Sequence, residues 1–156
     1  MDLKDTYNKI AKDWHKDHSR DEWWVEGTDK FISSLKENDL VLDVGCGAGT
    51  KSKYLIGKKI RVIGIDFSEE MIKIAKKEVP AGRFEVLDLD DIESLPELFD
   101  GIFMQAVLLH VPKKEVVSKL RKAVKRLKKG GYLYIAVKEK RRDGPEEEIV
   151  SENDYG

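Results

Sequence analysis

Five short apolar runs, separated by segments with helical features, constrain the fold of this chain more than any other feature. Each run is apolar on both sides, which is typical of a strand buried on both faces of a parallel sheet. Strand–helix alternation at this spacing predicts a doubly wound, mostly parallel α/β sheet with helices on both faces. The five predicted strands are Leu40–Val44, Arg61–Ile65, Phe84–Leu87, Gly101–Gln105 and Tyr132–Val137.

Three helices are predicted between these strands. The first two are Thr50–Ile56 and Glu69–Lys77, the second with Ser68 as its N-cap. A longer helix begins at Pro112 and is expected to end at Gly130–Gly131. Its predicted apolar stripe consists of Val116, Val117, Leu120, Val124 and Leu127.

The length of 156 residues predicts one domain with a single core. We expect residues 1–38 to form a helical cap or substrate segment, whose three tryptophans pack on the sheet or on a ligand. Residues 39–138 form the ligand-binding core, and the charged tail 139–156 is predicted to be flexible.

Charge and cysteine content narrow the function classes. With 29 basic and 30 acidic residues the net charge is −1, so neither nucleic acid nor an anionic membrane is an expected partner. Cys46 is the only cysteine, so no disulfide can form within the chain, and we expect no metal site. The sequence contains no apolar run long enough to span a membrane, and we expect a cytoplasmic protein.

The stretch LDVGCGAGT, residues 42–50, holds three glycines within five residues directly after the first strand. Ligands of doubly wound sheets bind beyond the carboxyl ends of the strands. Gly45, Gly47 and Gly49 allow a sharp turn and a close ligand approach, and the following helix offers free N–H groups. The loop therefore predicts a ligand site.

Acidic residues lie near the ends of the first three predicted strands. Asp66 follows Gly45 by 21 residues, where nucleotide-binding sheets place an acid for ribose hydroxyls, and Asp43 and Asp88 are its neighbours. Such an acidic rim should repel a pyrophosphate and favour a ligand with an amine or a sulfonium. An NAD-dependent oxidoreductase is an alternative, although the spacing is G-x-G-x-G rather than G-x-G-x-x-G.

Four segments together resemble the class I S-adenosylmethionine-dependent methyltransferases, especially the small "type 11" group. They are VLDVGCGAGT, VIGIDFSEEMI, RFEVLDLDDI and FDGIFMQAVLLHVP, and the likeness runs from about Tyr7 to Val137. The resemblance implies a Rossmann-like sheet of strand order 3-2-1-4-5. It also implies methyl transfer from S-adenosylmethionine to a small-molecule acceptor, with S-adenosylhomocysteine as product.

The resemblance also implies a set of cofactor-contacting residues. They are Tyr7 and Trp14 over the cofactor, Asp43, Gly45, Cys46, Gly47 and Gly49 around its methionine half, Asp66 at the ribose, Phe67, Met71, Asp88 and Leu89 at the adenine, and Gln105 and Ala106 near the sulfonium. His110 is the candidate general base, with a capping or pocket-wall role as the alternative.

The chain departs from this family after the fifth strand, where the family adds an antiparallel hairpin of strands 6 and 7. We expect this chain to lack both strands and to be a fragment of a longer protein. The edge of the fifth strand is then exposed, and a homodimer or a partner is expected to cover it. A non-catalytic or truncated cofactor-binding module therefore stays open as an alternative.

Overall fold

The fold is described from a computed structural model, which places residues 23–105, 111–138 and 145–151. Side chains are described up to Ala136. The strands are β1 (Leu40–Val44), β2 (Arg61–Asp66), β3 (Arg83–Val86), β4 (Phe99–Gln105), β5 (Leu127–Lys138) and β6 (Pro145–Ser151). The helices are α2 (Val25–Ser33), α3 (Thr50–Gly57), α4 (Glu69–Glu78), the 3-10 helix η1 (Leu89–Ser94) and α5 (Lys113–Val124).

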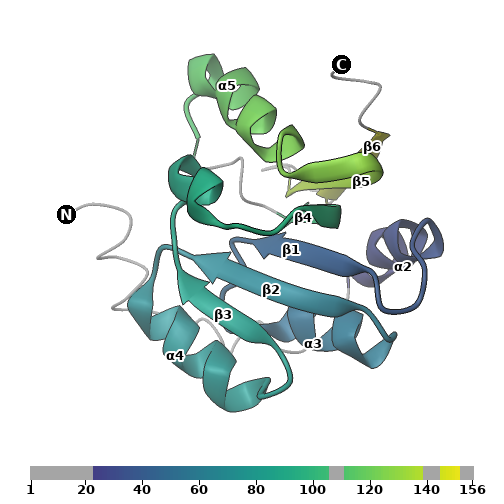
Figure 1. Cartoon of the computed structure of the whole chain (residues 1–156), viewed down its shortest axis with the longest axis vertical. Helices are drawn as coiled ribbons and strands as arrows, with labels where there is room; N and C mark the ends of the chain where they lie inside the picture. Colours follow the sequence, from purple (N-terminus) through teal and green to yellow (C-terminus); the bar gives the residue numbers. More distant parts are fainter. Residues whose placement is uncertain (1–22, 106–110, 139–144, 152–156) are drawn as a thin grey trace.

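The strands form a single sheet of order β3-β2-β1-β4-β5-β6, which Figure 1 shows from β3 at the bottom to β5 and β6 at the top. The first five strands pair in parallel and β6 pairs antiparallel to β5. The predicted order 3-2-1-4-5 is confirmed. β1 therefore lies at the point where the chain reverses its direction of winding, which is where sheets of this kind open a crevice for a ligand.

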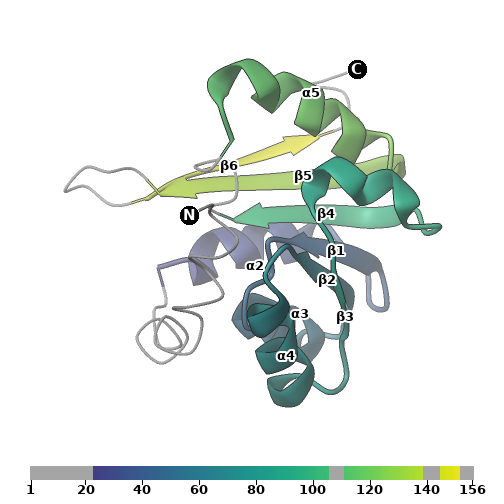
Figure 2. The same cartoon turned by 90° about the vertical axis from the view of Figure 1, so that its left-hand side faces the viewer.

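Helices cover both faces of the sheet, as predicted. Figures 1 and 2 show α5 on one side and α2, α3 and α4 on the other. On the α5 side, Leu42 and Val44 of β1 join a core cluster with residues of η1 and α5. On the opposite side, Val41 joins a second cluster with residues of α2 and α3. Alternate side chains of β1 thus pack into the two core clusters on opposite faces of the sheet.

The segment before β1 packs on the sheet through α2. Phe31 is completely buried against the stacked rings of Phe103 and Tyr134. Gly101 makes room for it, because a Cβ there would lie 2.6 Å from the Phe31 ring. Trp24 is also buried and meets the ring of Tyr54 edge-on. These contacts assign Phe31 and Trp24 to packing within the domain.

The predicted boundary between the third helix and the fifth strand is wrong. The helix ends at Val124, and Leu127 already pairs with Phe99 as the first residue of β5. Gly130 does not stop a helix, since it lies within β5 with φ of +81°, where the pairing with β4 is irregular. Leu127 would be buried at the end of a helix as well as at the start of a strand. Apolar spacing alone therefore extended the predicted helix too far. Val117, placed on the apolar stripe, is exposed.

The predicted flexible tail, and the expectation that no strand follows the fifth, are also wrong in part, because residues 145–151 form β6. Its register runs from Tyr132 opposite Ser151 to Lys138 opposite Pro145, so β6 covers the edge of β5 that was expected to be exposed. An edge strand is held by main-chain hydrogen bonds and tolerates charged residues, so the glutamate-rich sequence gave no apolar signal. The reason for expecting a homodimer or partner at β5 therefore falls away.

Candidate ligand site at the glycine loop

The strand register brings three residues together at the carboxyl end of the sheet. Val44 pairs with Ile65 on one side and with Met104 on the other. The next residues of the three strands are Gly45, Asp66 and Gln105, which therefore form a row at the mouth of the crevice. The predicted convergence of the glycine loop and Asp66 at this edge is confirmed.

The loop depends on left-handed backbone at all three glycines. The φ angles of Gly45, Gly47 and Gly49 are +69°, +55° and +88°, a region that residues with a Cβ rarely adopt. Gly49 is also closely packed, because an added Cβ would lie 3.0 Å from the Val79 side chain. Around Gly47 there is more room, with the Met71 sulfur 4.0 Å from the Cβ position. Gly49 is thus required by packing, whereas Gly47 leaves space at the loop.

Asp66 ties the loop to the next strand–helix turn. One carboxylate oxygen accepts the Gly47 N–H at 2.9 Å, and the other accepts the Ser68 N–H at 2.9 Å. Burial raises the pKa of Asp66, and these backbone N–H groups act in the opposite direction. The Phe67 N–H also acts on this carboxylate, and since a carboxylate has about four acceptor positions, Asp66 can still accept a hydroxyl. The predicted contact with a ribose is compatible with this arrangement and stays a prediction.

The helix after Asp66 begins as predicted. Ser68 is its N-cap and accepts the Met71 N–H at 3.2 Å. Met71 is buried beside Ala48 of the glycine loop, and Phe67 is half-buried. Met71 thus lies beside the loop, and the predicted contacts of Met71 and Phe67 with an adenine stay predictions.

Asp43 does not belong to the acidic rim. It is the penultimate residue of β1, only 1% exposed, and its carboxylate accepts a 2.6 Å hydrogen bond from the Ser52 hydroxyl of α3. Burial raises its pKa from 3.8 to about 6, against the opposing effects of the Ser52 bond and the Lys51 charge. Sequence reasoning missed Ser52, although a buried carboxylate must find a hydrogen-bond donor.

Asp88 lies two residues beyond β3 and is exposed. It is the N-cap of η1 and accepts the Asp90 N–H at 3.2 Å. Leu89, the first residue of η1, is buried in the core. The Asp88 carboxylate is therefore available to a ligand at the rim.

Gln105 ends β4 and is 7% exposed. Neither atom of its side-chain amide has a hydrogen-bond partner among the described residues. A buried amide without a partner is costly, so such a group marks a place where a ligand or water is expected to bind.

Cys46 is a packing residue in the loop. Its side chain is buried with Ile72, Ala75, Val79 and Phe84. Burial, with the nearby Asp43 and Asp66 charges, raises the pKa of the thiol well above its usual range. A thiol in this environment is a poor nucleophile, so only the Cys46 backbone can contribute to the site.

Four predicted site residues lie outside the described residues: Tyr7, Trp14, Ala106 and His110. Among the described residues, no three His, Cys, Asp or Glu side chains are grouped so that they could hold a metal ion. No helix in the described part of the chain is both long and apolar enough to cross a membrane.

Comparison with known proteins identifies the same region. Residues 41–131 match the family model described as a methyltransferase domain. Phosphoethanolamine N-methyltransferase 3 of Arabidopsis thaliana is 34% identical over 118 residues, which are 71% of this chain and 24% of that protein. The chain spans between about a quarter and a half of the length of the curated relatives it matches.

Two solved structures show the shared fold. A SAM-dependent methyltransferase of Methanosarcina mazei superposes with a TM-score of 0.61 at 31% identity, over 69% of this chain and 56% of that one. Magnesium protoporphyrin IX methyltransferase of Synechocystis PCC 6803, crystallised with bound SAM, gives a TM-score of 0.72 at 23% identity. That match covers 89% of this chain and 76% of the other.

Proposed function

Because this chain belongs to the methyltransferase domain family, we propose that it transfers a methyl group from S-adenosylmethionine to a small-molecule nucleophile. The family model covers β1 to the start of β5, which includes every described residue of the candidate site. The observation that carries the proposal is the row of Gly45, Asp66 and Gln105 across the mouth of the crevice.

The residues of the site fit this cofactor. The Gln105 amide is buried and has no partner among the described residues, so a polar group of a ligand would satisfy it. Asp66 keeps acceptor capacity for hydroxyls, and Asp88 is exposed nearby on the rim. Carboxylates at Asp66 and Asp88, with Asp43 behind them, favour a cation over a diphosphate.

We assign the binding roles from this arrangement. The backbone of Gly45–Gly47 would line the methionine half, and Asp66 would accept the ribose hydroxyls. Met71 and Phe67 would flank the adenine, and Asp88 would accept from its exocyclic amine. Tyr7 and Trp14 are proposed to cover the cofactor, and Ala106 is proposed to lie with Gln105 near the sulfonium.

For methyl transfer from this cofactor, the main task of the protein is to align the methyl donor with the acceptor. When bound, the cofactor supplies an electrophilic methyl group on a positively charged sulfur. The glycine loop and the row of polar residues would orient it, and a closed crevice would exclude water, which together can remove much of the barrier. Cys46 is excluded as a nucleophile by its burial and raised pKa. His110 is proposed as the general base for an acceptor that is protonated at neutral pH.

Calorimetric titration tests the proposal. We expect S-adenosylhomocysteine to bind and NAD not to bind. Asp66→Ala should weaken binding roughly 10- to 100-fold, because hydrogen bonds to a charged group contribute about 1.5–3 kcal/mol. Glu78→Gln, an exposed acid at the end of α4, is the matched control and should bind like the parent chain.

Three results would contradict the proposal in different ways. Binding of NAD in place of S-adenosylhomocysteine would indicate an oxidoreductase. Unchanged affinity in Asp66→Ala would remove this site from cofactor binding. Tight cofactor binding without methyl transfer to any nucleophile in an acceptor screen would indicate a binding module instead of an enzyme.

A further inference from the structure

Asp90 connects α5 to the carboxylate of Asp88. Its own carboxylate lies 2.5 Å from the Lys119 ammonium, and its carbonyl oxygen accepts from the Lys122 ammonium at 3.3 Å. Its N–H donates to the Asp88 carboxylate at 3.2 Å. A single residue of η1 therefore links a helix on the face of the sheet to an acid at the rim.

Lys119 is unusual because it is only 9% exposed. A buried ammonium is costly unless a charge compensates it, and Asp90 is the acid that does so here. The bond to Lys119 is also the main cause that lowers the pKa of Asp90, which therefore stays ionised. The pair thus links α5 to η1 through a buried ammonium and a half-exposed carboxylate.

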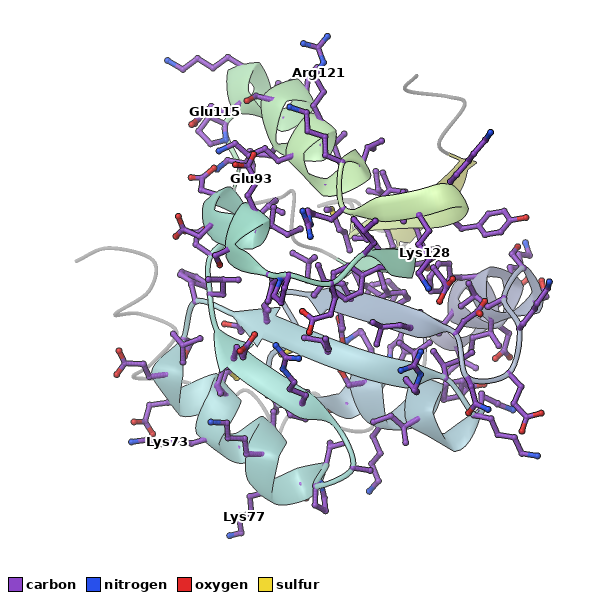
Figure 3. The ribbon with its side chains drawn as sticks, viewed as in Figure 1. Lys73, Lys77, Glu93, Glu115, Arg121 and Lys128 are labelled. Carbon is purple, nitrogen blue, oxygen red and sulfur yellow. The ribbon has the colours of Figure 1, made fainter. Side chains whose placement is uncertain are left out.

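Apolar contacts already hold η1 against α5 without this pair. Leu89 and Ile92 of η1 share a core cluster with Leu120 and Ala123 of α5. Figure 3 shows η1, marked by Glu93, beside α5, marked by Glu115. Apolar contacts permit small sliding movements, whereas a hydrogen-bonded ion pair with a buried lysine and a half-exposed aspartate favours one relative position of the two helices. Lys119 can therefore control where the first turn of η1, and with it Asp88, is held.

We propose that Lys119 is a positioning residue for the nucleoside end of the site, acting through Asp90 on the Asp88 carboxylate. The inference rests on the proposed function, in which Asp88 accepts from the exocyclic amine of the adenine. It identifies a residue of α5, on the opposite side of the sheet from α3 and α4, that sets the preference for adenine over other bases.

The test compares two ligands by calorimetry. S-adenosylhomocysteine carries the exocyclic amine, and its hypoxanthine analogue carries a carbonyl oxygen there. Lys119→Met keeps most of the side-chain volume and removes the charge. We expect it to weaken S-adenosylhomocysteine binding roughly three- to tenfold, the worth of about one hydrogen bond, and to leave the analogue's affinity unchanged. In a chain that already carries Asp88→Ala, Lys119→Met should have no further effect.

Controls separate positioning from general damage. Lys114→Met is the same substitution at an exposed position of α5 and should bind both ligands like the parent chain. Lys119→Arg keeps the charge and should restore the preference for adenine, and Asp90→Asn should weaken binding as Lys119→Met does. Thermal unfolding without ligand shows whether each variant is folded.

Each remaining outcome has a definite meaning. Equal affinity of Lys119→Met and the parent chain for S-adenosylhomocysteine would overturn the inference and leave the proposed function intact. Equal weakening for both ligands would also overturn it, because the effect would not pass through Asp88. A parent chain that binds neither ligand would overturn the proposed function itself.

Discussion

The Ser52 hydroxyl donates a 2.6 Å hydrogen bond to the Asp43 carboxylate, and both side chains are buried. Asp43 belongs to the strand before the glycine loop and Ser52 to the helix after it. The bond therefore joins the two elements that flank the glycine loop, in the interior of the protein. Because burial raises the pKa of Asp43 to about 6, the protonation state of the carboxylate in this hydrogen bond changes near pH 6.

The first prediction concerns the pH dependence of stability. The folded chain holds a proton on Asp43 up to about pH 6, whereas the unfolded chain loses it near pH 3.8. Stability should therefore fall as pH rises through this window, by about 3 kcal/mol from this group. The Asp43→Asn variant has no such proton and lacks this contribution, while its amide oxygen can still accept from Ser52.

Urea unfolding at pH 4 and pH 7.5 measures this difference. The stability of Asp43→Asn relative to the parent chain should increase between the two pH values. Parallel stability profiles for the two chains would show that Asp43 does not titrate as its burial implies.

The second prediction distinguishes the effect of the Ser52 hydrogen bond on the pKa of Asp43 from the effect of burial. Ser52→Ala removes the hydroxyl that donates to Asp43. The ionised Asp43 carboxylate then lacks this hydrogen bond, so the pKa of Asp43 should rise further. We expect a loss of about 1–3 kcal/mol in unfolding free energy at pH 8, with a smaller loss at pH 4, where Asp43 is neutral. Ser33→Ala, which removes an exposed hydroxyl bonded to the Lys30 carbonyl, is the control and should change little. Equal losses at both pH values would mean that Ser52 contributes only packing.

The features that were predictable from sequence are those governed by local chemistry. The glycine loop follows from the backbone demands of Gly45, Gly47 and Gly49, and the start of α4 follows from Ser68 as an N-cap. The parallel order of the first five strands follows from the alternation of buried strands and helices.

The features that sequence reasoning missed depend on tertiary contacts or main-chain pairing. Asp43 was placed at the rim because the sequence shows that it lies near the end of a strand. Its burial against Ser52 arises from the packing of α3, which the sequence does not show. The Lys119–Asp90 pair joins residues 29 positions apart. β6 is held by its register with β5, which a glutamate-rich segment does not reveal.

The third prediction compares two glycines of the same segment. Gly49 has φ of +88°, and an added Cβ would lie 3.0 Å from Val79, so Gly49→Ala combines backbone strain with a clash. We expect it to cost about 1–3 kcal/mol of unfolding free energy. Gly57, the last residue of α3, has open space around its Cβ position, and Gly57→Ala should be neutral or stabilise by up to about 1 kcal/mol. Equal effects of the two substitutions in urea unfolding would contradict this account of the loop.

The last prediction uses the single cysteine as a probe of the loop. The Cys46 side chain is 7% exposed and its thiol pKa is raised, so both access and thiolate are lacking in the folded chain. At pH 8 we expect an aromatic disulfide reagent to label the native chain at least 100-fold more slowly than the urea-unfolded chain, because reaction requires opening of the structure. Gly49→Ala should accelerate labelling in proportion to its loss of stability, whereas Gly57→Ala should not. Rapid labelling of the native parent chain, with one thiol consumed per chain, would show that the loop exposes Cys46 and that its side chain does not pack against α4.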